Sequence, residues 1–591
     1  MIVVFGGTTE GRKAVEVLEV AGKPFYYSTF SDGQEVELVH GIRLSGGMDS
    51  HAMLAFFREH DIRVAIDAAH PFAEDLHTNL LYAARHAGAA IIRYDRLYPP
   101  HTADCTWCCD YDNAVRQLET QGVERLLALT GVQTIGHLRA FWQKHECWFR
   151  ILNRHFSRLI ATRNCFPEDH LIAVESEDLT GENETATLIQ HLQPQAILTK
   201  ESGLSGGFTE KVEAAKKAGV QVFVIERPAY PPHTPVPQNV HIEMVNGPHG
   251  LRRAVEYLLP DFFPLKSGLT TGTCATAAVK AAVLSLQGEE EEAVWVQLPG
   301  GESVLVDIER AGRGEATVIK DFSDDPDVTR GCRITATVKA RPGGSSIRFL
   351  QGEGVGRVTL PGLGIPVGEP AINPVPRQMM TDAVRALTDA ALDITLSVEN
   401  GRELAKRTFN ERVGVVDGIS IIGTSGIVRP LSNDAFIQSI DRELEVARAI
   451  GCEAVGLASG KQGEQALLAQ EPGLRVVHYG NFIGAALYRA HQLGFHRVVL
   501  GIMIGKAVKL AEGHLDTHSH KVTMNKRFLT EVATAAAVPD AASKIEHITL
   551  ARELWDLMPP AFFTHLRDLC LRHCRQAFPD GELIIHLIRN E

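Results

Sequence analysis

The first residues able to do chemistry form a glycine-rich turn near the N-terminus. In FGGTTEG, Gly6, Gly7, Thr8, Thr9 and Glu10 stand between an apolar run, IVVF, and a helical pattern, EGRKAVEVLEVAG. Free backbone N–H groups at a helix N-terminus attract phosphate, and small residues let the phosphate approach. The turn therefore predicts nucleotide binding, and the alternative is tight packing of the helix on the strand.

Two more polar segments follow predicted strand ends. In DAAHPFAEDLH, His70 is a candidate proton donor or ligand of a substrate carboxylate; the alternative is a loop histidine that caps the next helix. In TKESGLSGG, Lys200, Glu201 and Ser202 precede a glycine-containing loop and a helix, a pattern typical of an anion cradle. These segments predict a polar site where strands give way to helices.

Two later clusters are rich in groups that can bind or release a proton. KDFSDDPDVT contains four aspartates, and GHLDTHSHK contains three histidines beside an aspartate. A metal site is one interpretation; the alternatives are an Asp/Pro turn and a polar loop near an active site. We expect no metal, and we take Asp325 and His518 as candidate catalytic residues. The clusters comprise Asp321, Asp324, Asp325, Asp327, His514, Asp516, His518 and His520.

Glycine-rich segments mark further candidate loops. QGEGVGRVTLPGLGIPVGEPAINPVP has glycine at positions 352, 354 and 356, and such a segment lets the backbone approach a flat ligand closely. GISIIGTSG predicts a strand followed by a loop over residues 423–426, with Arg429 nearby. GLASGK and GIMIGK are not phosphate loops, which need four residues between the glycines and Ser or Thr after the lysine. An ATPase or kinase is therefore excluded.

The composition narrows the class of protein. A chain of 591 residues, 45% hydrophobic and 22% charged, is typical of a globular protein, and its length suggests about three to five folding units. A formal net charge of −13 argues against a general nucleic-acid or membrane-surface binder. We see no secretory signal or membrane-spanning run and expect a cytoplasmic location with reduced cysteines. Cys105, Cys108 and Cys109 lack the second ligand pair of a zinc site.

The sequence predicts alternating strands and helices, and these elements must position the candidate residues. Over the first 230 residues, strands separated by helices predict parallel sheets in two Rossmann-like halves, about 1–100 and 101–255, with 227–245 as a loop. From Ser267, residues 294–312 and 331–344 predict hairpins with glycine turns. Strand and helix patterns alternate again towards the C-terminus. We therefore predict an α/β protein with modules 1–262 and 263–591, the second having an α+β part followed by an α/β layer.

The N-terminal motifs resemble one enzyme family. FGGTTEG, DAAHPFA, LALTGVQTI and TKESG, in this order, are similar to the precorrin-6A reductase family of corrin biosynthesis, over about residues 1–255. The resemblance implies hydride transfer from NADH or NADPH to a tetrapyrrole, with residues 6–10 at the nucleotide and His70 as the acid. The implied substrate contacts are Pro71, Phe72, Lys200, Glu201, Ser202 and Gly203.

The sequence does not decide between the two nicotinamide nucleotides. The second predicted strand, KPFYYSTF, ends in Ser and Thr instead of the acidic residue that would bind a ribose, and Asp32 is the nearest candidate. NADH and NADPH therefore both remain open.

The C-terminal motifs resemble a second family. SGLTTGTCATAA, KDFSDDPDVT, GEGVGRVTLPGLGIPVGEPAINPVPR, NFIG and IGKAVKLAEG are similar to the cobalt-precorrin-5B methyltransferase family, over about residues 265–591. That resemblance implies methylation of carbon 1 of the ring by S-adenosylmethionine, whose product is the substrate of the reductase. We predict a bifunctional enzyme; the alternatives are a reductase fused to a non-catalytic tetrapyrrole-binding or regulatory domain, and a tetrapyrrole carrier.

The second resemblance also implies site residues. We expect the methyl donor at Gly423, Thr424, Ser425 and Gly426, and arginines 357, 377 and 429 to bind substrate carboxylates. The family has a histidine where this chain has Met503, so a histidine of the 514–520 loop would have to replace it if a base is needed. A homo-oligomer stays open. The remaining expected substrate contacts are Thr270, Thr271, Gly272, Thr273, Gly354, Gly356, Asn373 and Asn481.

Overall fold

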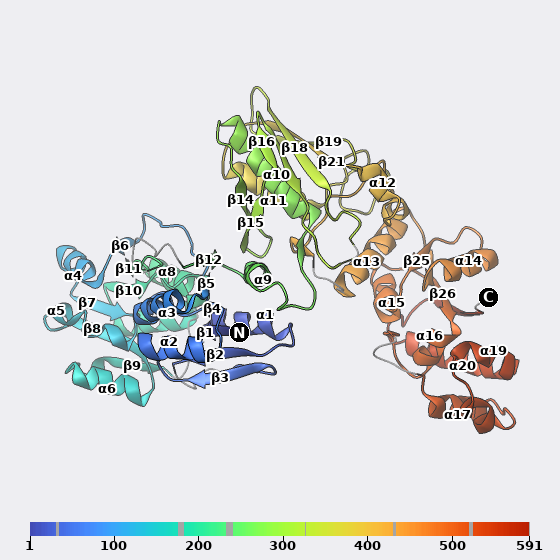
Figure 1. Ribbon diagram of the computed structural model, residues 1–591, viewed down its shortest axis with the longest axis horizontal. Helices are drawn as coiled ribbons and strands as arrows, with labels where there is room; N and C mark the ends of the chain where they lie inside the picture. The colour runs from blue at the N-terminus through green and yellow to red at the C-terminus, as the bar shows by residue number, and fades with distance from the viewer. Residues whose placement is uncertain are drawn as a thin grey trace. The chain divides into compact units, whose positions relative to one another are not determined.

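The computed structural model describes residues 1–30, 35–174, 182–231, 240–325, 327–428, 433–518 and 524–589. Asp32, Arg429 and His520 lie outside these ranges. The chain divides into two compact units: unit 1 comprises Met1–Leu265 with Gly300–Val304, and unit 2 comprises Lys266–Pro299 with Leu305–Glu591. In Figure 1, unit 1 is mostly blue to green and unit 2 mostly green to red.

The first sheet of unit 1 has six parallel strands in the order β12-β5-β4-β1-β2-β3. Its inner strands are apolar because helices cover both faces: α1 and α9 pack on one side, α2 and α3 on the other. The elements are β1 (Ile2–Phe5), α1 (Thr9–Glu19), β2 (Phe25–Thr29), β3 (Gly41–Ser45), α2 (Ser50–Glu59), β4 (Val64–Asp67), α3 (Glu74–Ala87), β5 (Ala90–Tyr94), β12 (Ile242–Val245) and α9 (Pro248–Leu258).

The second sheet is also parallel, in the order β6-β11-β10-β7-β8-β9. Helices α4, α5 and α6 contribute to one core, and α7 and α8 to the core on the other face. The elements are β6 (Thr106–Cys108), α4 (Tyr111–Thr120), β7 (Arg125–Ala128), α5 (Arg139–Trp142), β8 (Glu146–Leu152), α6 (His155–Arg163), β9 (Leu171–Val174), α7 (Glu182–Leu192), β10 (Ala196–Lys200), α8 (Phe208–Lys217) and β11 (Gln221–Ile225).

The division into halves differs from the prediction at one point. Residues 227–245 were expected to be loop, yet Ile242–Val245 forms β12, which pairs with β5 of the first sheet. The chain therefore leaves the second sheet after β11 and returns to the first. The reason is that α9 buries Leu251, Ala254 and Val255 against the first sheet's core, a contact that sequence order does not reveal.

The β-rich part of unit 2 surrounds one buried helix. α10 packs against β17 and β18 of a five-stranded sheet, β16-β17-β18-β21-β19, and its residues are buried over nearly its whole length. Residues 331–344 do not form the expected hairpin, because β19 pairs parallel with β21 instead of folding back on β18. The elements are β13 (Gly268–Leu269), α10 (Thr271–Leu286), β14 (Ala293–Gln297), β15 (Ser303–Asp307), β16 (Arg310–Gly312), β17 (Glu315–Ile319), β18 (Arg333–Ala340), β19 (Ile347–Gln351), β20 (Arg357–Val358), α11 (Pro374–Arg385), β21 (Leu392–Val398), α12 (Gly401–Ala405), β22 (Val415–Val416) and β23 (Ile427–Val428).

The rest of unit 2 is an α/β layer on a four-stranded parallel sheet, β25-β24-β26-β27. The predicted α/β class, with two Rossmann-like halves followed by an α+β part and an α/β layer, is thus confirmed. Among the described residues, no helix has both the length and the apolar character needed to cross a bilayer. The elements are α13 (Asn433–Ala449), β24 (Ala454–Ala458), α14 (Lys461–Gln470), β25 (Val476–His478), α15 (Ile483–Gln492), β26 (Arg497–Met503), α16 (Ile504–Ala511), α17 (Lys526–Ala535), α18 (Ala541–Glu546), α19 (Leu554–Leu557), α20 (Pro560–Cys574) and β27 (Glu582–Ile588).

Candidate functional site

The turn between β1 and α1 is open in front of Gly7. Its φ of +91° lies in the left-handed region, and a Cβ atom placed there would meet nothing within 4 Å. The Thr8 hydroxyl is occupied by protein: it accepts from the Gly11 N–H at 3.1 Å, capping α1, and donates to the Ala68 carbonyl at 2.6 Å. The backbone at Gly7 is therefore the accessible part of this turn.

Glu10, expected at the nucleotide, instead ties the two halves of unit 1 together. Its carboxylate is buried and accepts from Arg96 Nε at 3.0 Å and from the Ser205 hydroxyl. Arg96 also donates to the Ser202 carbonyl at 2.7 Å. Burial alone would raise the pKa of Glu10, but Arg96 and Ser205 outweigh it and lower that pKa. Glu10 thus stays ionised as a link between α1 and the loop after β10.

His70 follows β4, and several cationic side chains lie near it. Its Nδ1 accepts from the Phe72 N–H at 3.2 Å, so a neutral ring carries its proton on Nε2. Burial, together with Arg96, Lys200, Lys211 and Arg93, holds the pKa of His70 well below its ordinary value. The histidine is therefore a neutral hydrogen-bond donor near pH 7. It does not cap α3, whose N-cap residue is Ala73.

A buried charge network that the motif analysis missed fixes the backbone on either side of His70. Asp67, fully buried, accepts from His77 Nδ1 at 2.7 Å and from Arg93 Nη1 at 2.9 Å. His77 Nε2 donates to the His70 carbonyl at 3.1 Å, and Arg93 to the Ala69 carbonyl at 3.0 Å. The sequence signal was a charge inside each of two apolar strands, VAID and AIIRY, because buried charges must be paired.

Lys200 stands at the carboxyl end of β10, facing the same loop. Its ammonium lies 5.0 Å from the centre of the Phe72 ring, a cation–π contact. Burial lowers the pKa of Lys200 to about 8 and that of Lys211, which donates to the Gly206 carbonyl at 2.9 Å, to about 7. Both cations lie close enough to His70 to depress its pKa. The structure thus brings His70, Phe72 and Lys200 together.

The neighbours of Lys200 are used by the protein itself. The buried Glu201 carboxylate accepts from Arg227 and from the Arg227 N–H at 3.0 Å, which fastens the loop after β11. The Ser202 hydroxyl donates to the Gly206 carbonyl at 3.2 Å, and a Cβ on Gly203 would press on Arg96. These residues, expected to touch substrate, therefore shape the loop that presents Lys200. Pro71 is buried in the neighbouring loop.

In unit 2, the TTGT segment and the 423–426 loop bind each other. The Thr271 hydroxyl accepts from the Ile422 N–H at 2.9 Å, the Thr273 hydroxyl donates to the Gly426 carbonyl at 2.7 Å, and the Gly272 N–H donates to the Ile422 carbonyl at 2.9 Å. A Cβ on Gly423 would clash with Thr270. Residues 270–273, Gly423 and Gly426 consequently face protein, whereas Thr424 and Ser425 are exposed.

The alternating glycines let backbone approach backbone, not a flat ligand. A Cβ on Gly354, which has a φ of +75°, would clash with the Val398 carbonyl, and one on Gly356 would clash with Val415. Gly354 also accepts from the Ile419 N–H at 3.0 Å. The expected ligand contacts of these two glycines are therefore corrected: they join three segments of unit 2.

Replacing Gly354 with alanine should destabilise unit 2 by about 2 kcal/mol or more beyond the cost of a left-handed alanine, because the clash is with backbone. Gly344→Ala is the matched control, since its φ is +78° and its Cβ would meet nothing within 4 Å. Chemical unfolding of the full chain, followed by hydrogen exchange in peptides of unit 2, measures the difference. Equal costs for the two variants would show that the packing at Gly354 is loose.

The aspartate cluster organises the start of unit 2. Asp321 accepts from the Leu269 N–H at 2.7 Å, Asp324 from the Lys266 N–H at 2.6 Å, and Asp327 pairs with the buried Lys320 at 2.6 Å. Asp325 is half-buried in the same turn.

The second proposed base lies in the other part of unit 2, by the parallel sheet. The Thr517 N–H, next to His518, donates to the Asn481 carbonyl at 3.0 Å, and Lys506 donates to the Gly480 carbonyl. Met503 precedes α16 at the end of β26 and is half-buried. His518 and Asn481 therefore belong to one edge of the sheet.

The remaining residues of unit 2 that we expected to contact substrate bind other parts of the protein or lie partly exposed on its surface. Arg377 donates to the Ile372 and Pro370 carbonyls and pairs with Glu369 at 2.7 Å, so it fixes the loop before α11. Arg357 lies 3.6 Å from Asp417, with both side chains about half exposed. Asn373 precedes α11, and its backbone N–H donates to the Ile421 carbonyl at 3.0 Å.

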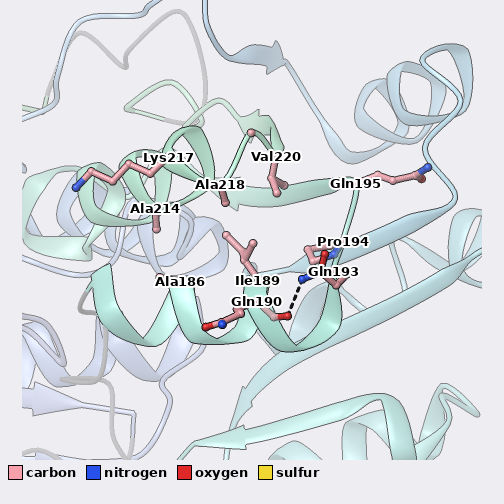
Figure 2. A pocket seen from close by; sticks show the side chains of 11 residues that line it. Ala186, Ile189, Gln190, Gln193, Pro194, Gln195, Ala214, Lys217, Ala218 and Val220 are labelled. Carbon is pink, nitrogen blue, oxygen red and sulfur yellow. Dashed lines mark hydrogen bonds between the residues drawn. The ribbon is translucent and has the colours of Figure 1, made fainter.

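A pocket of about 480 Å³ lies elsewhere in unit 1, at the C-terminal ends of α7 and α8 (Figure 2). Figure 2 shows the Gln193 amide bonded to the Gln190 carbonyl at its rim. The pocket contains no predicted site residue, because those stand at the opposite, carboxyl ends of the strands. Within the described ranges, no group of three or more His, Cys, Asp or Glu side chains could hold a metal ion.

Comparison with known proteins bears on both units. Residues 1–245 match the family "Precorrin-6x reductase CbiJ/CobK", and residues 261–430 match the family CbiD. The cobalt-precorrin-5B C(1)-methyltransferase of Prosthecochloris aestuarii is 43% identical over 343 residues, covering 54% of this chain and 92% of that protein. Its counterpart in Burkholderia cenocepacia is 44% identical over 290 residues, covering 47% and 80%.

Two solved structures are also similar. The cobalamin biosynthesis protein cbiD of Archaeoglobus fulgidus is 28% identical and covers 44% of this chain and 83% of that one, with a TM-score of 0.25. A structure titled CobK precorrin-6A reductase is 21% identical and covers 44% and 97%, with a TM-score of 0.36. The family resemblance seen in the motifs is confirmed by the sequence matches: the chain belongs to the cobalt-precorrin-5B C(1)-methyltransferase family and carries, ahead of that part, a member of the precorrin-6x reductase family, which makes it a fusion of two families of cobalamin biosynthesis.

Proposed function

We propose that the chain is a bifunctional enzyme that acts on one tetrapyrrole twice. Module 263–591 methylates cobalt-precorrin-5B at carbon 1 with S-adenosylmethionine, and module 1–262 then reduces the product, cobalt-precorrin-6A, to cobalt-precorrin-6B. The observation that carries the reductase part is the position of Gly7, His70 and Lys200 at the carboxyl ends of parallel strands. Ligands of open parallel sheets bind at that edge.

The turn at Gly7 fits a nicotinamide nucleotide. It combines an accessible backbone with the N-terminus of α1, an eleven-residue helix whose dipole favours an anion. When bound, the nucleotide supplies the hydride. The chain's own contribution is to hold the pyrophosphate in the open space in front of Gly7, at the N-terminus of α1, and to place the tetrapyrrole against His70 and Phe72.

The chain offers two groups that can assist reduction. His70, neutral and protonated on Nε2, donates a hydrogen bond to a substrate oxygen or nitrogen rather than acting as an imidazolium acid. Lys200 is protonated at neutral pH, because its pKa of about 8 lies above that pH, and it can bind a substrate carboxylate or deliver a proton to the ring. We propose Lys200 as the acid in place of His70.

The affinity for the tetrapyrrole should fall as pH rises through about 8, because Lys200 loses its charge there. Lys200→Gln should weaken binding at neutral pH by about tenfold and flatten this dependence. Lys200→Arg is the matched control and should keep binding strong above pH 8, since arginine stays protonated. Absorbance titration of the pigment measures all three. An unchanged pH profile in Lys200→Gln would exclude Lys200 from the site.

For methyl transfer, most of the rate can come from holding the methyl donor and the ring carbon in line. S-adenosylmethionine, when bound, supplies an electrophilic methyl group. We propose that Thr424 and Ser425 are the exposed part of its loop and that Asn481 and His518 lie at the tetrapyrrole. Asp325 or His518 then takes up a proton. An aligned, water-poor site accounts for the rate without a stronger base.

Mass spectrometry of the pigment tests the whole proposal. Incubating the full chain with cobalt-precorrin-5B and S-adenosylmethionine should add one CH₂, and adding NADH or NADPH should add two hydrogens. A reductase fused to a non-catalytic binding domain would reduce cobalt-precorrin-6A but never methylate. A carrier would show only a static absorbance shift. Either result would overturn the proposal.

A further inference from the structure

The four-stranded sheet of unit 2 reverses its strand order between β24 and β26. From β24 the chain adds β25 on one side, and it then crosses to place β26 on the other side. The helices that follow lie on opposite faces: Leu467 of α14 packs in one core and Val508 of α16 in the other. Ligands of open parallel sheets bind beyond the carboxyl ends of the strands at such a reversal. The loops after β24 and β26 are therefore where this sheet favours a ligand.

Lys506, the lysine of the GIMIGK segment, spans this reversal point. It lies in the first turn of α16, after β26, and its ammonium donates to the Gly480 carbonyl, which follows β25. The ammonium also lies 5.6 Å from the centre of the Tyr479 ring. The Tyr479 hydroxyl in turn donates to the Gly501 carbonyl of β26 at 3.2 Å. Because β24 lies between β25 and β26, the Lys506 side chain crosses the carboxyl end of β24.

A second lysine of the same helix lies beside Lys506. Lys509 is three residues further along α16, and its ammonium donates to the Thr517 carbonyl at 3.2 Å. Within the part of the chain that the structure describes, neither lysine forms an ion pair. Asp516, which precedes Thr517, accepts from the His518 N–H at 3.2 Å. Two half-buried cations thus lie together, each bonded to a neutral carbonyl.

This arrangement of charge favours an anion. Burial and, secondly, the ammonium of Lys509 lower the pKa of Lys506 to about 8. Since that value lies above neutral pH, Lys506 is mostly protonated there. Close like charges on one helix repel each other, and buried charges are normally paired. A carboxylate between the two ammonium groups would relieve the repulsion and form two charge-assisted hydrogen bonds.

We propose that Lys506 and Lys509 bind a carboxylate of the tetrapyrrole during methyl transfer. The inference rests on the proposed methyltransferase function, and it adds a cationic subsite to the position already given to Asn481 and His518. The carboxylates of the tetrapyrrole suit two ammonium groups. S-adenosylmethionine suits them less, because it carries a sulfonium and an ammonium of its own, which the lysines repel.

Methyl-transfer kinetics of the full chain test the proposal. Lys506→Gln and Lys509→Gln should each raise the KM for cobalt-precorrin-5B by about tenfold, because each loses one charge-assisted hydrogen bond. Glutamine can still donate to the same backbone carbonyl, so the loops stay fixed. The KM for S-adenosylmethionine should not change, and neither should the reduction of cobalt-precorrin-6A.

Two control variants separate charge from structure. Lys506→Arg keeps the positive charge and should keep the KM within about twofold of the native value. Lys526→Gln is the matched control, since this exposed lysine of α17 also donates to a backbone carbonyl, that of Glu546, at 2.7 Å. It should leave the KM for both substrates unchanged.

The pigment itself tests the carboxylate chemistry. Cobalt-precorrin-5B whose carboxyl groups are converted to methyl esters should have a raised KM with the native chain. It should show no further rise with Lys506→Gln or Lys509→Gln, because the ester offers these lysines no charge to pair with. A further rise with the ester would contradict a carboxylate contact.

Other outcomes would also overturn the subsite, and they differ from failure of the proposed function. An unchanged KM in both glutamine variants, a raised KM for S-adenosylmethionine instead, or an equal rise in Lys506→Arg would each exclude a tetrapyrrole carboxylate here. If the native chain does not methylate cobalt-precorrin-5B at all, the proposed function fails. Misfolding does not imitate the expected result, because loss of active enzyme lowers kcat and leaves KM in place.

Discussion

Replacing Asp67 with asparagine should lower the free energy of unfolding of unit 1 by about 3–5 kcal/mol, since the change removes the buried counter-charge of Arg93 and leaves that guanidinium only the longer, 3.4 Å contact with Asp95. Asp67 is fully buried and bonded to both Arg93 and His77. Asparagine keeps only one acceptor oxygen, so either Arg93 or His77, whose other nitrogen donates to the His70 carbonyl, also loses its acceptor. Hydrogen exchange in the intact chain, read in peptides covering β4 and β5, measures the loss.

The Asp67 carboxylate should also make the free energy of unfolding of unit 1 depend on pH in acid. Burial would raise the pKa of Asp67, but Arg93 and His77 lower it from 3.8 to about 2. A lowered folded-state pKa stabilises the fold above the unfolded-state value, and this stabilisation is lost as pH falls from about 4 to about 2. The variant should lose less stability than the native chain over this range.

Asp75→Asn serves as the control for both measurements. Asp75 is exposed in the first turn of α3, so its neutralisation should cost less than about 1 kcal/mol. A cost for Asp67→Asn as small as that for Asp75→Asn would mean that Arg93 reaches water and that the network does not fix the His70 loop.

Gly7→Val should abolish reduction and spare methyl transfer. A β-branched residue at a φ of +91° is strained, and its methyl groups would fill the space in front of the turn where we place the pyrophosphate. Displacing the nucleotide by even 1 Å lowers the rate by about 100-fold. Pigment mass after each step gives both activities in one experiment.

Gly22→Val is the matched control for Gly7→Val. Gly22 has a φ of +64°, an added Cβ there would meet nothing within 4 Å, and it follows the far end of α1. It should therefore show the backbone strain without the loss of reduction. Loss of both activities in Gly7→Val would contradict two independent sites on one chain.

Chain order and local pattern were enough for the outline of the fold. Alternating apolar strands and amphipathic helices predicted the parallel sheets, because both periodicities follow from backbone geometry. β12 was not predicted. Its four residues follow a proline-rich stretch and show little local pattern, and they form a strand because they pair with β5. The parallel pairing of β19 with β21 was missed for the same reason.

The sequence by itself determined which families the chain joins and where its reactive loops begin, since motif order and strand-to-helix turns are local features. Only the tertiary structure decided which residues in those loops remain accessible. Gly7 stays exposed and Lys200 half-buried, whereas Glu10, Glu201 and Gly354 are used by the protein. Whether a polar side chain or a glycine meets ligand or protein depends on partners distant in the chain, and burial forces each charge to find one.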